Sequence, residues 1–124
     1  FLYAVGCGSQ ILMFGVAWDM ATNCDEGTVL ASQKNLNQLS DRIGAFDDTI
    51  RDAIKGSTGG TDGAFVQEGS RRANLKTGIA GQSDTTTGWA NVPSQCVTYA
   101  SCHDNLCLYD KIVDSVYGAD GKYR

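Results

Sequence analysis

The chain has few basic residues and no long hydrophobic run. Its 124 residues include 10 Lys or Arg against 14 Asp or Glu, so the formal net charge is −4. This balance argues against nucleic acid or an anionic membrane as a partner. Glycines and polar residues at positions 6 and 8–10 interrupt the apolar stretch 1–18, whereas a transmembrane helix needs about 20 consecutive apolar residues. We therefore expect neither a nucleic-acid partner nor a membrane partner.

The sequence also lacks a Cys-x-x-Cys pair, and its cysteines number five, so complete internal pairing is impossible. Cys96, Cys102 and Cys107 lie close in sequence to His103, the single histidine. Four such side chains can bind zinc tetrahedrally. Adjacent Cys102 and His103 tend to point apart, so we expect no metal at this place. A small domain held together by zinc or a disulfide remains an alternative.

The glycine-rich stretch Gly56–Gly63 has no Gly-Lys-Ser/Thr ending. A loop that cradles phosphate needs that ending. We therefore predict a flexible connection here and no phosphate site.

An apolar fraction of 42% is enough for a hydrophobic core and argues against disorder. Short apolar runs predict strands at 11–14, 43–46 and 97–99. Apolar residues at helical spacing predict a helix over 50–55, ended by Gly56, and a second over 106–116, ended by Gly118. Little periodicity marks 21–40 or 69–94, which we expect to be irregular. Strands that lead into helices are typical of α/β proteins.

The polar cluster His103-Asp104-Asn105 lies between the last predicted strand and the last predicted helix. In barrels and open α/β sheets, the carboxyl ends of strands carry the chemistry. The cluster is therefore the first candidate for a functional site. The alternative is that His103 and Asp104 merely cap the following helix, because Asp and Asn are good N-caps.

Three stretches carry a resemblance to a known family. The stretch 103–112 (HDNLCLYDKI) is similar to the last signature region of the alpha-amylase superfamily of glycoside hydrolases. Its longer context resembles the pullulanase-type starch-debranching enzymes most. The stretch 50–57 (IRDAIKGS), followed by 65–67, and the pattern Gly15-x-x-Trp18-Asp19-Met20 are further matches, and all occur in the family's order.

The resemblance implies an α/β fold that is part of a (β/α)8 barrel, roughly strands five to seven with their helices. Such a barrel usually needs about 250 residues. Residues 1–124 are therefore expected to be a single segment of a catalytic barrel, incomplete as an autonomous domain. Either the rest of a longer polypeptide or another chain would complete it.

The same resemblance implies cleavage of alpha-1,6 branch links in pullulan or starch-like glucans. It assigns Asp104 as the catalytic aspartate that stabilises the transition state. It also implies that His103, Asn105 and Trp18 bind the sugar, an α-glucan oligosaccharide or polysaccharide. For Trp18 a place in the core is an equal alternative. No cofactor is implied, although the family resemblance allows a calcium ion.

The chain departs from the family pattern in two places. Position 16, where the family has its general-acid glutamate, is Val16, and the region of the nucleophile would precede residue 1. Loss of a general acid costs a factor of about 100 to 10,000, so we expect this chain alone to be inactive. A non-catalytic glucan-binding or structural piece is the alternative. Secretion and the bacterial cytoplasm both agree with the sequence.

Overall fold

The structure is a computed structural model that describes residues 12–20, 23–117 and 122. Three parallel strands form its sheet in the order β1-β2-β3. They are β1 (Met13–Gly15), β2 (Ile43–Asp47) and β3 (Cys96–Thr98). Residue 13 lies opposite 43, and residue 45 opposite 96, so the carboxyl ends of all three strands meet at one edge of the sheet.

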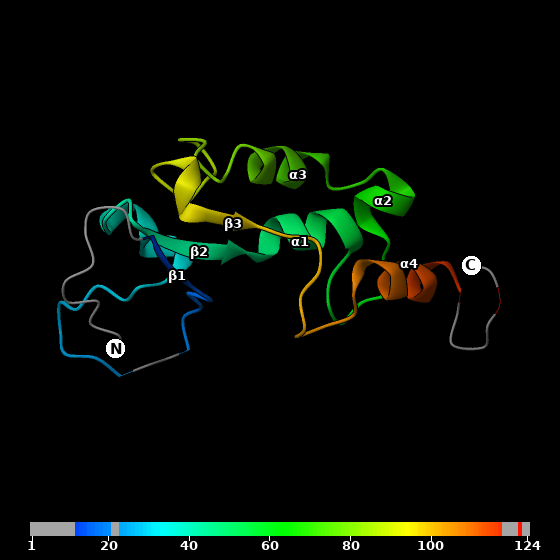
Figure 1. Ribbon diagram of the computed structural model, residues 1–124, viewed down its shortest axis with the longest axis horizontal. Coiled ribbons are helices and arrows are strands. Elements are labelled where there is room, and N and C mark those ends of the chain that lie inside the picture. Colours follow the sequence, from blue (N-terminus) through cyan, green and yellow to red (C-terminus); the bar gives the residue numbers. More distant parts are fainter. Residues whose placement is uncertain (1–11, 21–22, 118–121, 123–124) are drawn as a thin grey trace.

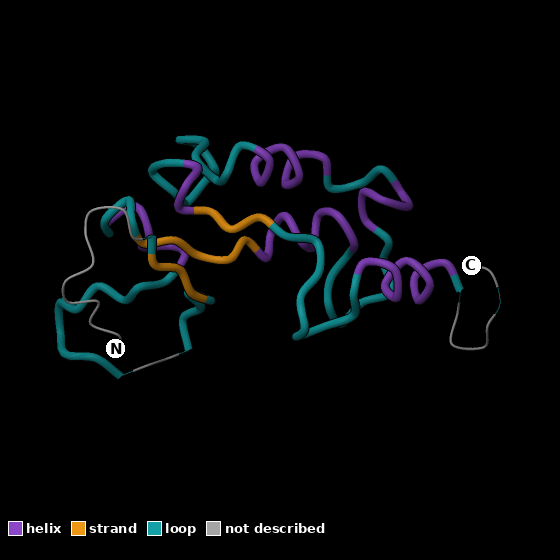
Figure 2. Tube along the Cα trace, viewed as in Figure 1, coloured by secondary structure: helices purple, strands orange, loops and turns teal. Residues whose placement is uncertain are grey.

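Helices connect and extend these strands, as Figures 1 and 2 show. Their bounds are η1 (Gln33–Gln38), α1 (Asp48–Lys55), α2 (Ala64–Glu68), α3 (Arg72–Ile79), η2 (Pro93–Gln95) and α4 (Leu108–Val116). Helix α1 continues directly from β2, α2 and α3 pack against it, and α4 lies near its C-terminal end (Figure 1). None of the helices in the described residues is long and apolar enough to cross a membrane.

The hydrophobic core is centred on β2 and α1. Its buried apolar side chains are Leu36, Ala45, Ile50, Ala53 and Ala64. Helix α3 approaches α1 closely at Gly78, where a Cβ atom would lie 2.4 Å from Cβ of Ile50. Only a glycine permits this contact, because real Cβ atoms do not come so near one another. The core is therefore small and confined to the region around β2 and α1.

Strand β1 lies outside this core. Met13 is 45% exposed and Phe14 57% exposed, although the Phe14 ring meets the Phe46 ring edge-on with centroids 5.6 Å apart. Within the described residues β1 and β3 each pair with β2 alone. Both outer strands therefore present an unpaired edge, which other chain segments commonly cover in α/β proteins.

The structure confirms an α/β fold with a parallel sheet, and each predicted strand has a counterpart. Helix α1 confirms the predicted helix over 50–55, and Gly56 is its C-cap, as expected. Helix α4 begins at Leu108, later than expected. The predicted beginning of the first strand at Ile11 and the predicted stop at Gly118 lie outside the described residues. That the sheet is part of a barrel stays a prediction.

Two stretches expected to be irregular contain helices. Helix α3 lies within 69–94, and η1 lies within 21–40. Helix α3 escaped prediction because its sequence, RANLKTGI, has no strong apolar face, and its contact with α1 is made through Gly78. Within the glycine-rich stretch, Ser57 Oγ donates to Asp62 Oδ1 over 2.9 Å. That this stretch is a flexible connection stays a prediction.

Candidate functional site

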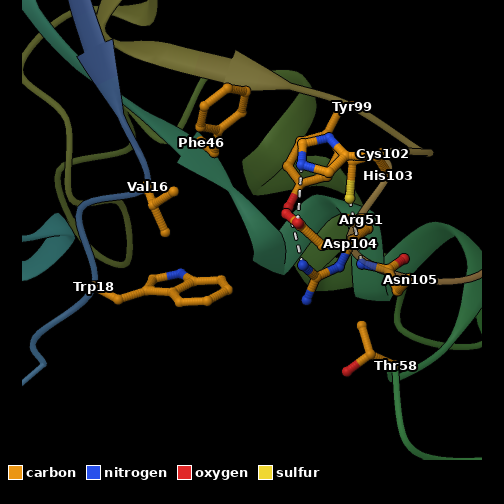
Figure 3. Close-up of a pocket in the computed structure, with 10 residues that line it drawn as sticks. All are labelled: Val16, Trp18, Phe46, Arg51, Thr58, Tyr99, Cys102, His103, Asp104 and Asn105. Atoms are coloured by element: carbon orange, nitrogen blue, oxygen red, sulfur yellow. Dashed lines mark hydrogen bonds and ion pairs between the residues drawn. The ribbon is translucent and has the colours of Figure 1, made fainter.

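A pocket of about 640 Å³ lies at the carboxyl ends of the strands (Figure 3). Residues from the loops after β1, α1 and β3, from β2 and from α1 surround it. The described lining residues are Val16, Trp18, Phe46, Arg51, Thr58, Tyr99, Cys102, His103, Asp104 and Asn105. The structure therefore brings together all four sequence-predicted site residues, which lie at positions 18 and 103–105.

His103 and Asp104 project from the loop that follows β3 (Figure 3). Nε2 of His103 lies 3.1 Å from Oδ1 of Asp104, and the two side chains are 93% and 61% exposed. Neither side chain caps α4: Cys107 is the N-cap, and its sulfur accepts from the backbone N–H of Asp110. The capping alternative is therefore wrong, and the carboxylate of Asp104 is free to meet a ligand.

Asn105 is held more firmly than its neighbours. Its Oδ1 accepts a hydrogen bond of 2.6 Å from Nζ of Lys55, and its Nδ2 donates to Sγ of Cys102 over 3.3 Å. Lys55 is buried at the C-terminal end of α1, and burial lowers the pKa of its ammonium group. Asn105 therefore links the site loop to the helix that follows β2.

Arg51 and Tyr99 form the inner wall of the pocket. Nη1 of Arg51 donates to the Tyr99 hydroxyl over 2.9 Å, and its Nε donates to Oδ1 of Asp52 over 2.7 Å. The Tyr99 ring meets the Phe46 ring edge-on at 5.7 Å. Burial raises the pKa of Tyr99, so this wall keeps a phenolic hydroxyl and a permanent cation at neutral pH.

Val16 and Trp18 form the opposite wall. Figure 3 shows both side chains across the pocket from Arg51 and Asp104. Trp18 is 48% exposed, so it lies at the pocket and not in the core. Ala17 between them has φ of 54°, a left-handed backbone conformation that costs about 1 kcal/mol or more for a residue with a Cβ atom.

The carboxylates at the end of β2 do not line the pocket. Asp47 is fully buried, and its Oδ1 accepts from the backbone N–H of Ile50, which caps α1. Its Oδ2 accepts from Nε2 of Gln82 over 2.7 Å. Asp48 accepts from Gln33 over 2.9 Å. Asp104 is therefore the one carboxylate among the described lining residues.

No disulfide staples the part of the chain that the structure describes. Cys24, Cys96, Cys102 and Cys107 are free thiols, and Cys7 lies outside the described residues. The described residues contain no group of three or more His, Cys, Asp or Glu side chains that could hold a metal ion. The disulfide alternative is therefore wrong for Cys96, Cys102 and Cys107, and the zinc alternative finds no support.

Sequence reasoning missed four of the ten described lining residues of the pocket. Phe46, Arg51, Thr58 and Tyr99 line it, yet none was singled out as a site residue. Phe46 and Tyr99 end the short apolar runs that predict strands at 43–46 and 97–99, and a strand role hides a second role at the pocket. Arg51 belongs to the resembling stretch 50–57 and follows a strand end by one helical turn, which was the signal available for it.

No family model matches the chain, but individual proteins do. The pullulanase of Bacillus subtilis strain 168 is 34% identical in an alignment of 112 positions that covers 82% of this chain. Its crystal structure with maltose matches at a TM-score of 0.75, with 33% identity over 86% of this chain. The chain is homologous to a segment of the pullulanases. This homology overturns the alternative of an unrelated small domain.

A second solved structure supports the same relationship. The pullulanase of Paenibacillus barengoltzii, solved with maltohexaose and alpha-cyclodextrin, matches at a TM-score of 0.74, with 35% identity over 87% of this chain. The chain covers 14% of the Bacillus subtilis protein and 17% of the Paenibacillus barengoltzii chain. The homology is therefore at the level of a segment, about one seventh of the first relative.

Proposed function

We propose that this chain is a segment of the catalytic barrel of a pullulanase-type enzyme, in which it forms one wall of the glucan site. The observation that carries the proposal is the pocket at the carboxyl ends of the three parallel strands, where Trp18, His103 and Asp104 meet. An indole face suits the apolar side of a pyranose ring, and charged or amide groups suit its hydroxyls. Homology to pullulanases solved with maltose and maltohexaose supports an α-glucan as the ligand.

We assign the residues of the pocket as follows. Asp104 lies beside the reacting sugar and stabilises positive charge at its anomeric carbon. His103 and Asn105 hydrogen-bond the sugar hydroxyls, and Trp18 packs against a ring. In the complete barrel this arrangement would serve the cleavage of alpha-1,6 branch links.

We propose further that the 124-residue chain does not itself cleave glucans. Glycoside hydrolysis normally needs two carboxyl groups that flank the scissile bond. Asp104 is the one carboxylate among the described lining residues, and the opposite wall offers Val16, which cannot donate a proton. The same chemistry favours the second candidate, a non-catalytic piece that binds glucan, over an active enzyme.

The exposed face of β1 supports the idea of an incomplete barrel. Met13, Phe14 and Val16 are each at least 45% exposed, and no other described strand pairs with the outer edges of β1 and β3. In a closed barrel, neighbouring strands and interior side chains would cover such surfaces. We propose that chain segments outside the 124 residues, in the same polypeptide or another chain, cover them.

Calorimetric titration of the chain with maltohexaose tests the binding role. We expect measurable binding, and Asp104→Asn should weaken it about tenfold or more, because charge-assisted hydrogen bonds to the sugar are lost. Asp25→Asn removes the same charge at an exposed turn and serves as the matched control. Incubation with pullulan should release no reducing ends. Equal affinity in all three proteins would contradict the assignment of Asp104, and reducing-end release would contradict inactivity.

A further inference from the structure

His103 and Asp104 have little support of their own. They are 93% and 61% exposed, and among the described residues their side chains bond only to each other. Exposed side chains on a loop usually sample several orientations. A site that uses these two groups therefore needs something else to fix the loop that carries them.

The residues on either side of the pair are fixed by one lysine. Nζ of Lys55 donates to Oδ1 of Asn105 and to the backbone carbonyl of Leu106, each over 2.6 Å. Asn105 in turn donates to Sγ of Cys102 over 3.3 Å. His103 and Asp104 thus stand on a short arch between Cys102 and Asn105, and both ends of the arch connect to Lys55.

Lys55 is an unusual residue for this position. It is the last residue of α1, only 2% exposed, and within the described part of the chain its ammonium group has no ion-pair partner. A buried ammonium group is costly, and burial lowers its pKa. Its two neutral acceptors both lie in the loop of His103 and Asp104, so this cost is offset by contacts to that loop.

We propose that Lys55 is a positioning residue of the glucan site, holding the arch 102–105 in the orientation in which His103 and Asp104 face the pocket. The inference rests on the proposed glucan site.

Lys111 of α4 makes the reverse connection: it is also 2% exposed, and its Nζ donates to the backbone carbonyl of Gly60. Gly60 belongs to the loop that brings Thr58 to the pocket. Each of these two pocket loops is thus held by a buried lysine. Lys55 of α1 holds the loop that carries the arch, and Lys111 of α4 holds the loop that carries Thr58.

The test uses Lys55→Met, which keeps an apolar stem and removes the donors, with exposed Lys76→Met on α3 as the matched control. The first readout is the alkylation rate of Cys102 by iodoacetamide, followed by mass spectrometry with exposed Cys24 as the internal reference. The second is the affinity for maltohexaose. In Lys55→Met we expect Cys102 to react about tenfold faster and maltohexaose to bind about tenfold more weakly, with neither change in Lys76→Met.

The two readouts separate this inference from the proposed function. If the unmodified chain does not bind maltohexaose, the glucan proposal fails, while the Cys102 rate still decides whether Lys55 orders the arch. A folded Lys55→Met chain with an unchanged Cys102 rate overturns the inference. If circular dichroism shows that Lys55→Met is unfolded, Asn105→Ala removes the same hydrogen bond from the loop side. Faster alkylation of Cys102 in Asn105→Ala supports the inference, and an unchanged rate overturns it.

Discussion

Two strand-to-helix corners of this molecule carry acidic residues, and they use them in opposite ways. At the corner between β2 and α1, Asp47 is fully buried and accepts hydrogen bonds from Ile50 N–H and Gln82. At the corner between β3 and α4, Asp104 is 61% exposed and contacts only His103 among the described residues. The N-cap role there belongs to Cys107 instead.

The difference shows how a sequence of this kind separates a buried, structural carboxylate from one that is exposed at a pocket. A strand-end aspartate that caps its own helix and is buried, as Asp47 is, already accepts hydrogen bonds from the protein and is out of reach of a ligand, so it contributes stability. When another residue takes over the cap, the aspartate becomes available to the pocket. Helix capping is therefore the feature that distinguishes the two corners.

The largest effect expected from this comparison is on stability. Asp47→Ala should lower the free energy of unfolding by about 3 kcal/mol, because it removes an N-cap worth about 1 kcal/mol and leaves the buried Gln82 amide unpaired at about 2 kcal/mol. Asp104→Ala should stay within about 0.5 kcal/mol, as exposed substitutions usually do. Urea unfolding followed by circular dichroism measures both. Equal losses of unfolding free energy in the two variants would contradict the difference between the roles of Asp47 and Asp104.

A smaller effect on the free energy of unfolding is expected from ionisation of the Cys96 thiol, which lies beside Asp47. Burial, together with the nearby Asp47 charge, raises the pKa of Cys96 from 9.0 to about 12, and its Sγ lies 3.6 Å from Oδ2 of Asp47. Since the folded state holds this proton more tightly than the unfolded state, the stabilisation is complete below pH 9 and is lost as the pH rises from 9 towards 12. In Cys96→Ser this particular loss should be absent.

Unfolding free energies of the two proteins at a series of pH values from 8 to 11 measure that difference. Groups such as lysine and tyrosine titrate in both proteins, so only the difference between the two slopes reports on Cys96. Parallel slopes would mean that the Cys96 thiol ionises as easily in the folded as in the unfolded state, and that the Asp47 corner is less enclosed than described.

The sequence anticipates both corners but not the difference between them. Strand runs and helical spacing predict β2, α1 and α4, because each has an apolar face of its own. The partners of the buried Asp47 come from distant positions, Gln82 and Cys96, and no local pattern in the sequence indicates such long-range contacts. For the same reason Lys55 reads as an ordinary exposed lysine at a helix end, although the structure buries it.

The candidate site also combines residues that the local sequence reveals with residues whose role depends on long-range contacts. The cluster 103–105 is predictable because polar residues at a strand end are locally visible and match a family pattern. Tyr99 and Arg51 are less visible, because their joint role depends on a hydrogen bond between residues 48 positions apart. Helix α3 is missed for a further reason: it packs on α1 through a glycine, and glycine carries no hydrophobic signal.

The smallest effect concerns the cap that frees Asp104. Sγ of Cys107 accepts weakly from Asp110 N–H over 3.5 Å, and serine is a better N-cap than most residues. Cys107→Ser should therefore raise the free energy of unfolding by a few tenths of a kcal/mol, whereas Cys107→Ala should lower it by up to about 0.5 kcal/mol. Urea unfolding again provides the measurement, with Asp104→Ala alongside. If Asp104→Ala destabilised α4 more than Cys107→Ala does, Asp104 would be the true cap, and its carboxylate would be occupied in the same way as that of Asp47.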